Sequence, residues 1–310
     1  MNKYPAPEFS VKYLLPQHWG TLLLIAVAYL LSLLPWKLQF MLGKGVGRLA
    51  MLLLPRRRRI IERNLELCFP TMSASKRRKL VQANIDNTGL ALLETGMAWY
   101  WSDARVARHV SFEGLEHIEP LLAQGRGILL VSVHSLNLEL GARACGLKLS
   151  GMGVYRPNNN PCFDYFQYKG RTRGGHQVIH RKDVKTMLDS LRSGRVLWYA
   201  PDHDYGPRRH AFAPLFAVEQ ACTTTGTSLL VDETDCAIVP FTIVRTDDSG
   251  HYTLTFRQPL LEEFPRHNPE AGARVINKLV ETSILAAPSQ YMWLHRRFKT
   301  RPEGQPSLYR

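Results

Sequence analysis

A run of apolar residues from Ile128 to Val133, interrupted only by Ser132, is the clearest structural signal in the chain. Its length and its β-branched content are typical of a strand that is buried on both faces of a sheet. The run ends at His134, and the residues after it, 136–146, are rich in helix formers. The pattern therefore predicts that His134 lies where a strand passes into a helix, which is where ligands of open α/β sheets bind.

The rest of the chain also alternates between strand and helix patterns. Ser73 and Ser75 are candidate caps for a long helix that continues to about Tyr100. Besides 127–133, the pattern predicts strands at 151–155, 176–180, 195–200, 236–244 and 252–258, helices at 182–194 and 269–286, and a hairpin turn at 247–250. Such alternation predicts an α/β fold with a mixed, mostly parallel sheet flanked by helices.

The N-terminal region contains a segment that resembles a membrane anchor. Residues 13–36 carry no formal charge, and the part from Trp19 to Trp36 is long enough to cross the hydrocarbon core of a bilayer. Tryptophans at both ends suit the two membrane interfaces. A buried core helix is the alternative. A cleaved signal peptide is disfavoured by the few charges before the segment and by Pro35-Trp36-Lys37 at its end.

Cations are concentrated on the C-terminal side of this segment. Lys37, Lys44, Arg48 and the run Arg56–Arg59 follow it, whereas only Lys3 and Lys12 precede it. The positive-inside rule therefore places the main body in the cytoplasm. Residues 38–55 are apolar with a few cations, which predicts an interfacial helix with the arginine run at phosphate level. We divide the chain into an anchor and basic interfacial segment, 1–60, and a single domain, 61–310.

The net charge of the 310-residue chain, +14, points to an anionic partner. Nucleic acid, anionic lipid and an acidic carrier protein all fit this charge. Nucleic acid is disfavoured because the chain lacks a known binding motif and its cations are not interleaved with aromatic residues. The five cysteines form no CxxC pair, which predicts neither a zinc site nor a disulfide framework and fits a reducing compartment.

His134 and Glu139 are candidates for a catalytic pair. A histidine can remove a proton near neutral pH, and a carboxylate can orient its ring and stabilise its cation. Five positions correspond to about 500° on a helix, so the two residues would not share a helical face. We therefore expect His134 to lie outside the helix that carries Glu139, with the side chains in hydrogen-bond reach, roughly 2.6–3.2 Å. The alternative is a polar residue followed by an ordinary helix.

Further polar residues follow other predicted strands. Arg156 comes after the strand at 151–155, and Asp202, His203, Asp204 and Arg208 come after the strand at 195–200. Arg171 and Arg173 lie in what reads as a glycine-rich basic loop, 169–175. Histidine, carboxylates and several arginines at one sheet edge fit a phosphorylated substrate, because arginine binds phosphate bidentately. Residues 202–204 also contain possible hard metal ligands, but nothing completes a set.

Several stretches together resemble the late acyltransferases of lipid A biosynthesis, of the lauroyl/palmitoleoyl type. They are residues 134–143, 153–161, 181–185, 198–208, 214–226 and 291–304, and the resemblance extends over nearly the whole chain. They resemble the first late acyltransferase more than the one that adds the final, myristoyl chain. The resemblance implies a glycerol-phosphate-acyltransferase-like fold and a bacterial inner-membrane protein with its catalytic domain on the cytoplasmic side.

The resemblance also implies a reaction. A fatty acyl chain passes from a thioester on acyl carrier protein to the 3-hydroxyl of an acyl chain on the tetraacylated lipid A precursor that carries two Kdo sugars. The family's H-x4-D/E motif falls on His134 and Glu139, with glutamate as the acid. Arg156, Arg171 and Arg173 become candidates for phosphates of lipid or donor, and Asp202 and Asp204 for organising arginines or holding sugar hydroxyls.

No covalent acyl-enzyme, metal or other cofactor is required by this chemistry, because a thiolate is a good leaving group, and no GxSxG motif is present. Anionic membrane lipids and the acidic carrier protein would account for the basic surface. Two alternatives remain open at this point. One is a glycerolipid acyltransferase that uses glycerol 3-phosphate or lysophosphatidate, and the other is a lipid A binding protein without catalytic activity.

Overall fold

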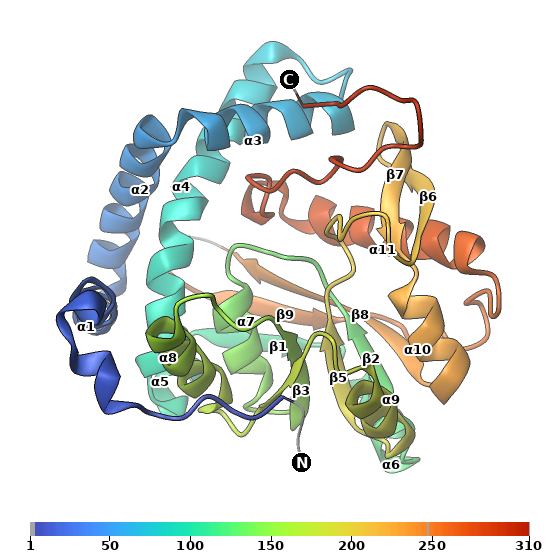
Figure 1. The fold of residues 1–310 in the computed structure, drawn as a ribbon, viewed down its shortest axis with the longest axis horizontal. Helices are drawn as coiled ribbons and strands as arrows, with labels where there is room; N and C mark the ends of the chain where they lie inside the picture. The colour runs from blue at the N-terminus through green and yellow to red at the C-terminus, as the bar shows by residue number, and fades with distance from the viewer. Residues whose placement is uncertain (1–3, 247, 310) are drawn as a thin grey trace.

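A seven-stranded sheet forms the centre of the computed structural model, which describes residues 4–246 and 248–309 (Figure 1). The strand order is β1-β9-β8-β2-β5-β3-β4. The strands are β1 (Val110–Glu113), β2 (Ile128–Val131), β3 (Gly151–Tyr155), β4 (Gln177–His180), β5 (Val196–Tyr199), β8 (Ala237–Arg245) and β9 (Tyr252–Phe256). Neighbouring strands pair in parallel except β8 and β9, which are antiparallel. The predicted mixed, mostly parallel sheet is confirmed.

Helices cover both faces of this sheet. They are α1 (Trp19–Leu33), α2 (Trp36–Leu53), α3 (Pro55–Cys68), α4 (Ala74–Tyr100), α5 (Asp103–Ala107), α6 (Glu119–Ala123), α7 (Leu138–Cys145), α8 (Pro161–Thr172), α9 (Val184–Arg192), α10 (Gly226–Thr234) and α11 (Pro269–Ala286). Short 3-10 turns lie at Val11–Leu14, Pro16–His18, Leu115–His117 and Pro288–Gln290. Ser73 caps α4 as expected, and Gly194 follows α9 with a positive φ of 74°.

Alternation along β2 divides the core into two layers. Leu129 and Val131 pack in a cluster with residues of α9, α10 and α11, whereas Ile128 and Leu130 pack in a second cluster with residues of α4 and α7. Successive side chains of a strand point to opposite faces, so this one apolar run supplies both layers. The long apolar run at 128–133 therefore marks the centre of the fold.

Several segments differ from the sequence-based expectation. Lys169, Gly170 and Arg171 belong to helix α8 and not to a loop, because Asn160 caps this helix and Pro161 opens it. A second, two-stranded antiparallel sheet, β6 (His210–Leu215) with β7 (Val218–Thr224), has no counterpart among the predicted strands. Strand β1 and helix α10 were also missed. Of the predicted hairpin turn, Asp247 lies outside the described residues.

The N-terminal helices α1 and α2 pack against the long helix α4. Gly47 and Gly89 allow α2 and α4 to approach closely, since a Cβ atom at either position would clash with backbone of the other helix. One stretch, Pro16–Leu33, is long and apolar enough to cross a membrane, and only 11% of it is buried within the protein. The buried-core alternative for this segment therefore fits poorly. The division at residue 60 falls inside α3 and stays a prediction, as does the likeness to glycerol-phosphate acyltransferases.

Candidate active site

The connection between β2 and α7 places His134 at the carboxyl edge of the sheet. Because β2 ends at Val131 and α7 begins at Leu138, His134 lies outside the helix that carries Glu139, as expected. The connection is bound to the C-terminal segment. The amide of Met292 donates to the carbonyl of His134 at 3.1 Å, the amide of Leu136 donates to the carbonyl of Gln290 at 2.7 Å, and Ser135 forms an antiparallel bridge with Tyr291.

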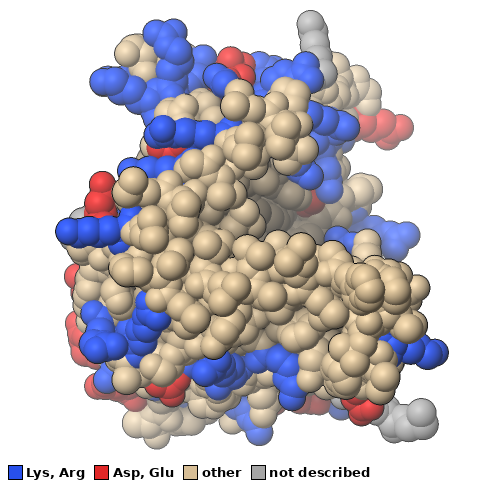
Figure 2. Space-filling view, turned by 90° about the vertical axis from the view of Figure 1, so that its left-hand side faces the viewer, with Lys and Arg blue, Asp and Glu red and all other residues tan. Residues whose placement is uncertain are grey.

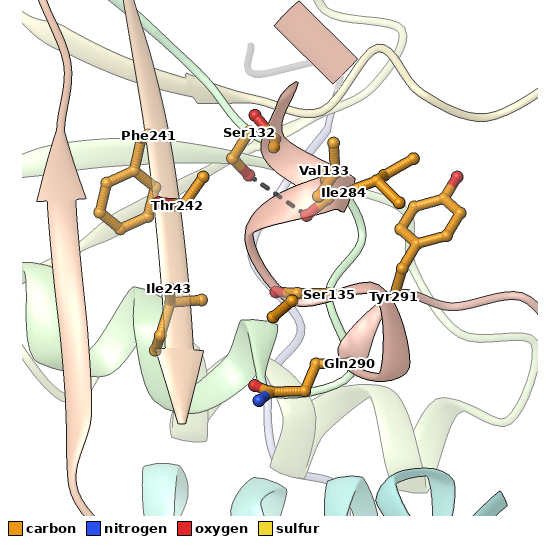
Figure 3. Close-up of a pocket in the computed structure, with 11 residues that line it drawn as sticks. Ser132, Val133, Ser135, Phe241, Thr242, Ile243, Ile284, Gln290 and Tyr291 are labelled. Atoms are coloured by element: carbon orange, nitrogen blue, oxygen red, sulfur yellow. Dashed lines mark hydrogen bonds between the residues drawn. The ribbon is translucent and has the colours of Figure 1, made fainter. Parts of the chain in front are cut away.

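Figure 3 shows this junction, with Ser132, Val133 and Ser135 between strand β8 on one side and Gln290 and Tyr291 on the other. The side chain of Gln290 accepts from the amide of Arg245 and donates to its carbonyl, both at 2.9 Å. Helix α4 supports the same segment, because Asn84 donates to the carbonyl of Tyr291 at 2.7 Å. The position of His134 is therefore determined by hydrogen bonds from three distant parts of the chain.

Asp202 is the hydrogen-bond partner of the His134 ring. Nδ1 of His134 lies 2.7 Å from Oδ1 of Asp202, and the backbone N–H of His134 donates to Oδ2 at 3.1 Å. Asp202 is fully buried, while the His134 side chain is 24% exposed. Strand β5 positions Asp202, because β5 pairs with β2 in parallel and both strands end at the same edge.

Charge and tautomer follow from this contact. Burial would raise the pKa of the Asp202 carboxyl, but attraction to His134 and His203 and the hydrogen bonds from His134 hold that pKa well below its ordinary value. An ionised carboxylate only accepts hydrogen bonds, so Nδ1 of His134 carries the proton. Nε2 is then the basic nitrogen. His134 therefore has the arrangement of a general base with an orienting carboxylate.

The His134 ring is the first of three stacked histidine rings. The rings of His134 and His203 lie 3.6 Å apart with an interplanar angle of 8°, and His295 stacks on the other face of His203 at 4.1 Å. Burial is the main cause that lowers the pKa of His203, to about 3, and the attraction of Asp202 for the imidazolium only partly opposes it. A neutral His203 therefore covers one face of the base without adding charge.

The expected hydrogen bond between His134 and Glu139 is wrong. Glu139 lies in the first turn of α7 and is paired with Arg171 of α8, whose Nε donates to its two carboxylate oxygens at 3.0 and 3.2 Å. The indole of Trp99 donates to the same carboxylate at 3.3 Å. The bidentate guanidinium satisfies Glu139 more fully than one imidazole N–H would. Sequence spacing predicted Glu139 as the hydrogen-bond partner of His134, whereas the structure places Asp202 there.

His134, Glu139 and Arg171 line a pocket of about 280 Å³ between the sheet and helices α7 and α8. Leu138, Ala142 and Cys145 present one face of α7 to this pocket. The opposite wall comes from strands β2, β5, β3 and β4, and Arg156 lies at the end where His134 is found. A mostly apolar pocket with a few polar groups at one end is typical of a ligand site.

Three of the remaining candidates serve the protein's own structure or lie away from this pocket. Arg173 donates to the carbonyl of Trp99 at 2.9 Å. Asp204, which is buried, accepts from the amide and hydroxyl of Thr300 at 2.7 and 2.8 Å. Asp202 and Asp204 therefore do not organise arginines, since their oxygens are bound to His134 and Thr300, and the alternative that they hold sugar hydroxyls stays a prediction. Arg208 is exposed in the loop between β5 and β6.

Metal coordination was an alternative for residues 202–204. His134, Asp202 and His203 bring possible ligand atoms within 4.8 Å of one another. However, Asp202 already accepts two hydrogen bonds from His134, and Nδ1 of His134 faces the carboxylate. Proton transfer therefore fits the hydrogen bonds of this cluster better than metal coordination does.

A histidine that a carboxylate orients, beside an apolar pocket, fits an enzyme that acts on an acyl or other lipid chain. Residues 6–300 match the family model described as bacterial lipid A biosynthesis acyltransferase, and the chain belongs to this family. It is thus an acyltransferase of lipid A biosynthesis, as the sequence motifs predicted.

The chain is similar over its full length to three characterised proteins of Escherichia coli (strain K12). It is 51% identical to the lipid A biosynthesis lauroyltransferase, over 98% of this chain and 99% of the relative. It is 42% identical to the palmitoleoyltransferase, over 99% of both chains. Identity to the myristoyltransferase is 27%, over 100% of this chain and 96% of the relative. The predicted greater resemblance to the first two is confirmed.

Proposed function

We propose that this enzyme transfers a fatty acyl chain, of the lauroyl or palmitoleoyl type, from acyl carrier protein to lipid A precursor. The acceptor is the 3-hydroxyl of an acyl chain on the tetraacylated precursor that bears two Kdo sugars. The observation that carries the proposal is the position of His134, with its Nδ1 bound to Asp202, at one end of the apolar pocket. Such a pocket suits an acyl chain, and the base beside it suits the hydroxyl that attacks.

The chemical steps follow from the tautomer of His134. Nε2 removes the proton of the acceptor hydroxyl while its oxygen attacks the thioester carbonyl. Asp202 stabilises the imidazolium that forms. The C–S bond of the tetrahedral intermediate then breaks, the new ester remains on the acceptor, and the proton on Nε2 passes to the departing thiolate. His134 returns to its starting state without a covalent acyl-enzyme.

Glu139 acts through Arg171 in this proposal. Burial opposes a charge on the Arg171 guanidinium, but its pKa is raised because Glu139 faces it. The pair lines the pocket near His134 and keeps the guanidinium in a fixed orientation. Arg156, which is exposed at the same end, is the better candidate for a phosphate of the donor's phosphopantetheine or of the lipid. Arg173 and Arg208 receive no substrate role.

Membrane association follows from the surface of α1 and α2. Large apolar side chains on this face are exposed, including Leu23, Leu24 and Leu30 of α1 and Met41, Leu49 and Leu52 of α2. Figure 2 shows a broad face without charged side chains, with cationic groups around it. Without the 3-10 turn that precedes it, the regular helix α1 has 15 residues and extends over about 22 Å, less than the hydrocarbon thickness of about 30 Å. We propose that α1 and α2 lie in one leaflet, on the cytoplasmic side of the bacterial inner membrane.

The proposed reaction is tested with the purified full chain in detergent. Acyl–acyl carrier protein and the Kdo-bearing precursor are supplied, and product mass spectrometry should record the gain of one acyl group. His134→Ala should reduce this gain to a small residual level. Glycerol 3-phosphate and lysophosphatidate serve as competing acceptors. Acylation of either in place of the precursor, or full activity of His134→Ala with a normal melting curve, would overturn the proposal.

The orientation at the membrane has its own test. Flotation with vesicles should show binding that increases with anionic lipid and falls with salt, because the cations Arg56–Arg59 border the apolar face. Leu49→Glu and Leu52→Glu should weaken binding, whereas a charge placed at the distant, exposed Ala123 should not. Unchanged flotation of the leucine variants would contradict the proposed orientation.

A further inference from the structure

Two glycines in β3 leave open space in the wall of the pocket. Gly151 and Gly153 alternate with Met152 and Val154, so they share one face of the strand. Both line the pocket, and a Cβ atom built on Gly153 would meet nothing within 4 Å. A Cβ atom on Gly151 would touch Val196 at ordinary contact distances of 3.4–3.6 Å. Glycine weakens a strand interior, and a ligand that approaches the backbone closely is one reason for its presence.

The register of the sheet gives the position of each glycine along the pocket. Gly153 is level with Trp198 of β5 and Val178 of β4, and Gly151 is level with Val196. The rise along a strand is about 3.3 Å per residue. Measured along β3 from Tyr155 toward the amino end, Gly153 therefore lies at roughly 7 Å and Gly151 at roughly 13 Å. Tyr155 is at the carboxyl end of β3, the sheet edge where His134 lies. Gly153 is therefore in the middle of the pocket and Gly151 near its inner end.

A hydrogen bond links two of the pocket's lining residues on the side of Gly151. His176, which precedes β4, is hydrogen-bonded through Nε2 to the carbonyl of Ala142 in α7, at 2.5 Å. A carbonyl only accepts, so Nε2 donates. This bond joins the two walls of the pocket beyond Gly153. We expect this bond to limit how far a chain that enters from the His134 end can extend.

We infer that Gly153 and Gly151 set the length of the acyl chain that this enzyme transfers. The inference rests on the proposed function, because it takes the occupant to be the chain of the donor thioester. An extended chain advances roughly 1.25 Å per bond, since bonds of about 1.5 Å zigzag. About 13 Å of pocket therefore holds a chain of roughly ten to twelve carbons. Bulk at Gly153 shortens this space by about half, and bulk at Gly151 removes only its inner end.

Gly153→Val and Gly151→Val test the inference, and Ala123→Val is the matched control. Valine suits strand positions, and Ala123 is an exposed residue at the end of α6, outside the pocket. Each variant is incubated with an equimolar mixture of acyl–acyl carrier proteins whose chains have about eight to sixteen carbons. Because each buried methylene adds to binding, these donors compete by chain length. Product mass spectrometry reads the preferred length.

The expected results differ in size between the two positions. Gly153→Val shifts the preferred product to chains shorter by roughly four to five carbons, and Gly151→Val shifts it by one to three, in proportion to their depths. Each methylene of the acyl chain that the pocket can no longer bury lowers kcat/KM for the original donor by about fourfold. For four methylenes, the decrease is on the order of 100-fold. Ala123→Val keeps the product distribution of the unmodified enzyme. An unchanged distribution in Gly153→Val overturns the inference.

A binding measurement separates this inference from the proposed reaction. Saturated fatty acids of increasing length should raise the melting temperature of the unmodified protein up to a limiting length, and Gly153→Val should reach its limit at a shorter chain. If this limit shifts while no acyl transfer from carrier protein occurs, the pocket assignment stands and the proposed reaction fails. If Gly153→Val does not fold, Gly153→Ala gives a smaller shift in the same direction. Equal limits in all folded variants overturn the inference.

Discussion

Replacing Asp202 by asparagine tests which carboxylate orients the base. Asparagine has nearly the same shape, and its carbonyl oxygen can still accept from the backbone of His134. Its amide group, however, donates toward Nδ1, which favours the tautomer that carries the proton on Nε2. His134 then lacks its free base nitrogen. The 2.7 Å contact of a fully buried carboxylate makes this loss large. We expect kcat to fall by a factor on the order of 10³–10⁴, as in other histidine–carboxylate pairs.

Glu139→Gln is the matched comparison. Glutamine keeps an oxygen that accepts from Arg171 and Trp99, so the geometry persists and one charge is lost. We expect at most about a tenfold decrease in kcat/KM, which corresponds to about 1.4 kcal/mol of transition-state stabilisation. The assay is acyl transfer from carrier protein to the precursor, with melting curves to verify folding.

Double variants identify the partner of His134 independently of the size of each effect. If Asp202 acts through His134, the variant His134→Ala/Asp202→Asn is as active as His134→Ala alone. Glu139→Gln should lower the residual activity of His134→Ala by the same factor as it lowers that of the unmodified enzyme. The reasoning is refuted if Asp202→Asn retains near-normal kcat while Glu139→Gln loses a factor of 10³ or more.

Three further variants have defined outcomes. Arg156→Ala should raise KM for the acyl donor about tenfold with little change in kcat, because it removes a phosphate contact used equally in ground and transition states. Steady-state kinetics at varied donor concentration measure this KM, and an unchanged value would contradict the role of Arg156. Asn84→Ala removes the 2.7 Å hydrogen bond to the carbonyl of Tyr291 and should lower the free energy of unfolding by about 1–3 kcal/mol, along with kcat. Denaturant unfolding measures it, and the exposed Gln82→Ala, expected within about 0.5 kcal/mol of the unmodified chain, is its control. The pKa of His203 is about 3 in the folded state and about 6.5 when unfolded, so the unfolded state binds the extra proton between these values. The contribution of His203 to the free energy of unfolding is fully present above about pH 6.5, and that free energy falls by up to about 1.4 kcal/mol per pH unit as the pH decreases toward about 3. His203→Phe should flatten this dependence in melting curves recorded at several pH values. An equally steep dependence in that variant would contradict the assignment.

Local patterns in the sequence predicted most elements of the central sheet and the long helices. Helix α11 begins at Pro269 and ends at Ala286, the limits expected from its proline and its apolar periodicity. Strand β3 coincides with 151–155. Segments without such signals were missed. The second sheet, β6 and β7, contains Pro214 and many polar residues, and α8 contains a glycine and several charges that resemble a loop.

For the site residues, the sequence predicted the sheet edge at which they lie but not which of them form hydrogen bonds with one another. The sequence indicated that His134 and Asp202 both follow strands, but 68 positions separate them, and only the pairing of β2 with β5 makes them neighbours. Glu139 was assigned to His134 because it is near in sequence. Trp99 of α4 and Arg171 of α8 bind it instead, and helix packing that brings these residues together has no local signature.

The contact between His134 and the C-terminal segment has a consequence for synthesis in the cell. The amide that binds the carbonyl of His134 belongs to Met292, and the stacked histidines end at His295. A chain emerging from the ribosome presents the apolar helices α1 and α2 first and the residues around 290 last. Domains form from the N-terminal side during synthesis. If the proposed membrane orientation and reaction hold, the chain reaches the lipid surface before His134 is positioned, and we expect an unfinished chain to leave acyl thioesters unreacted.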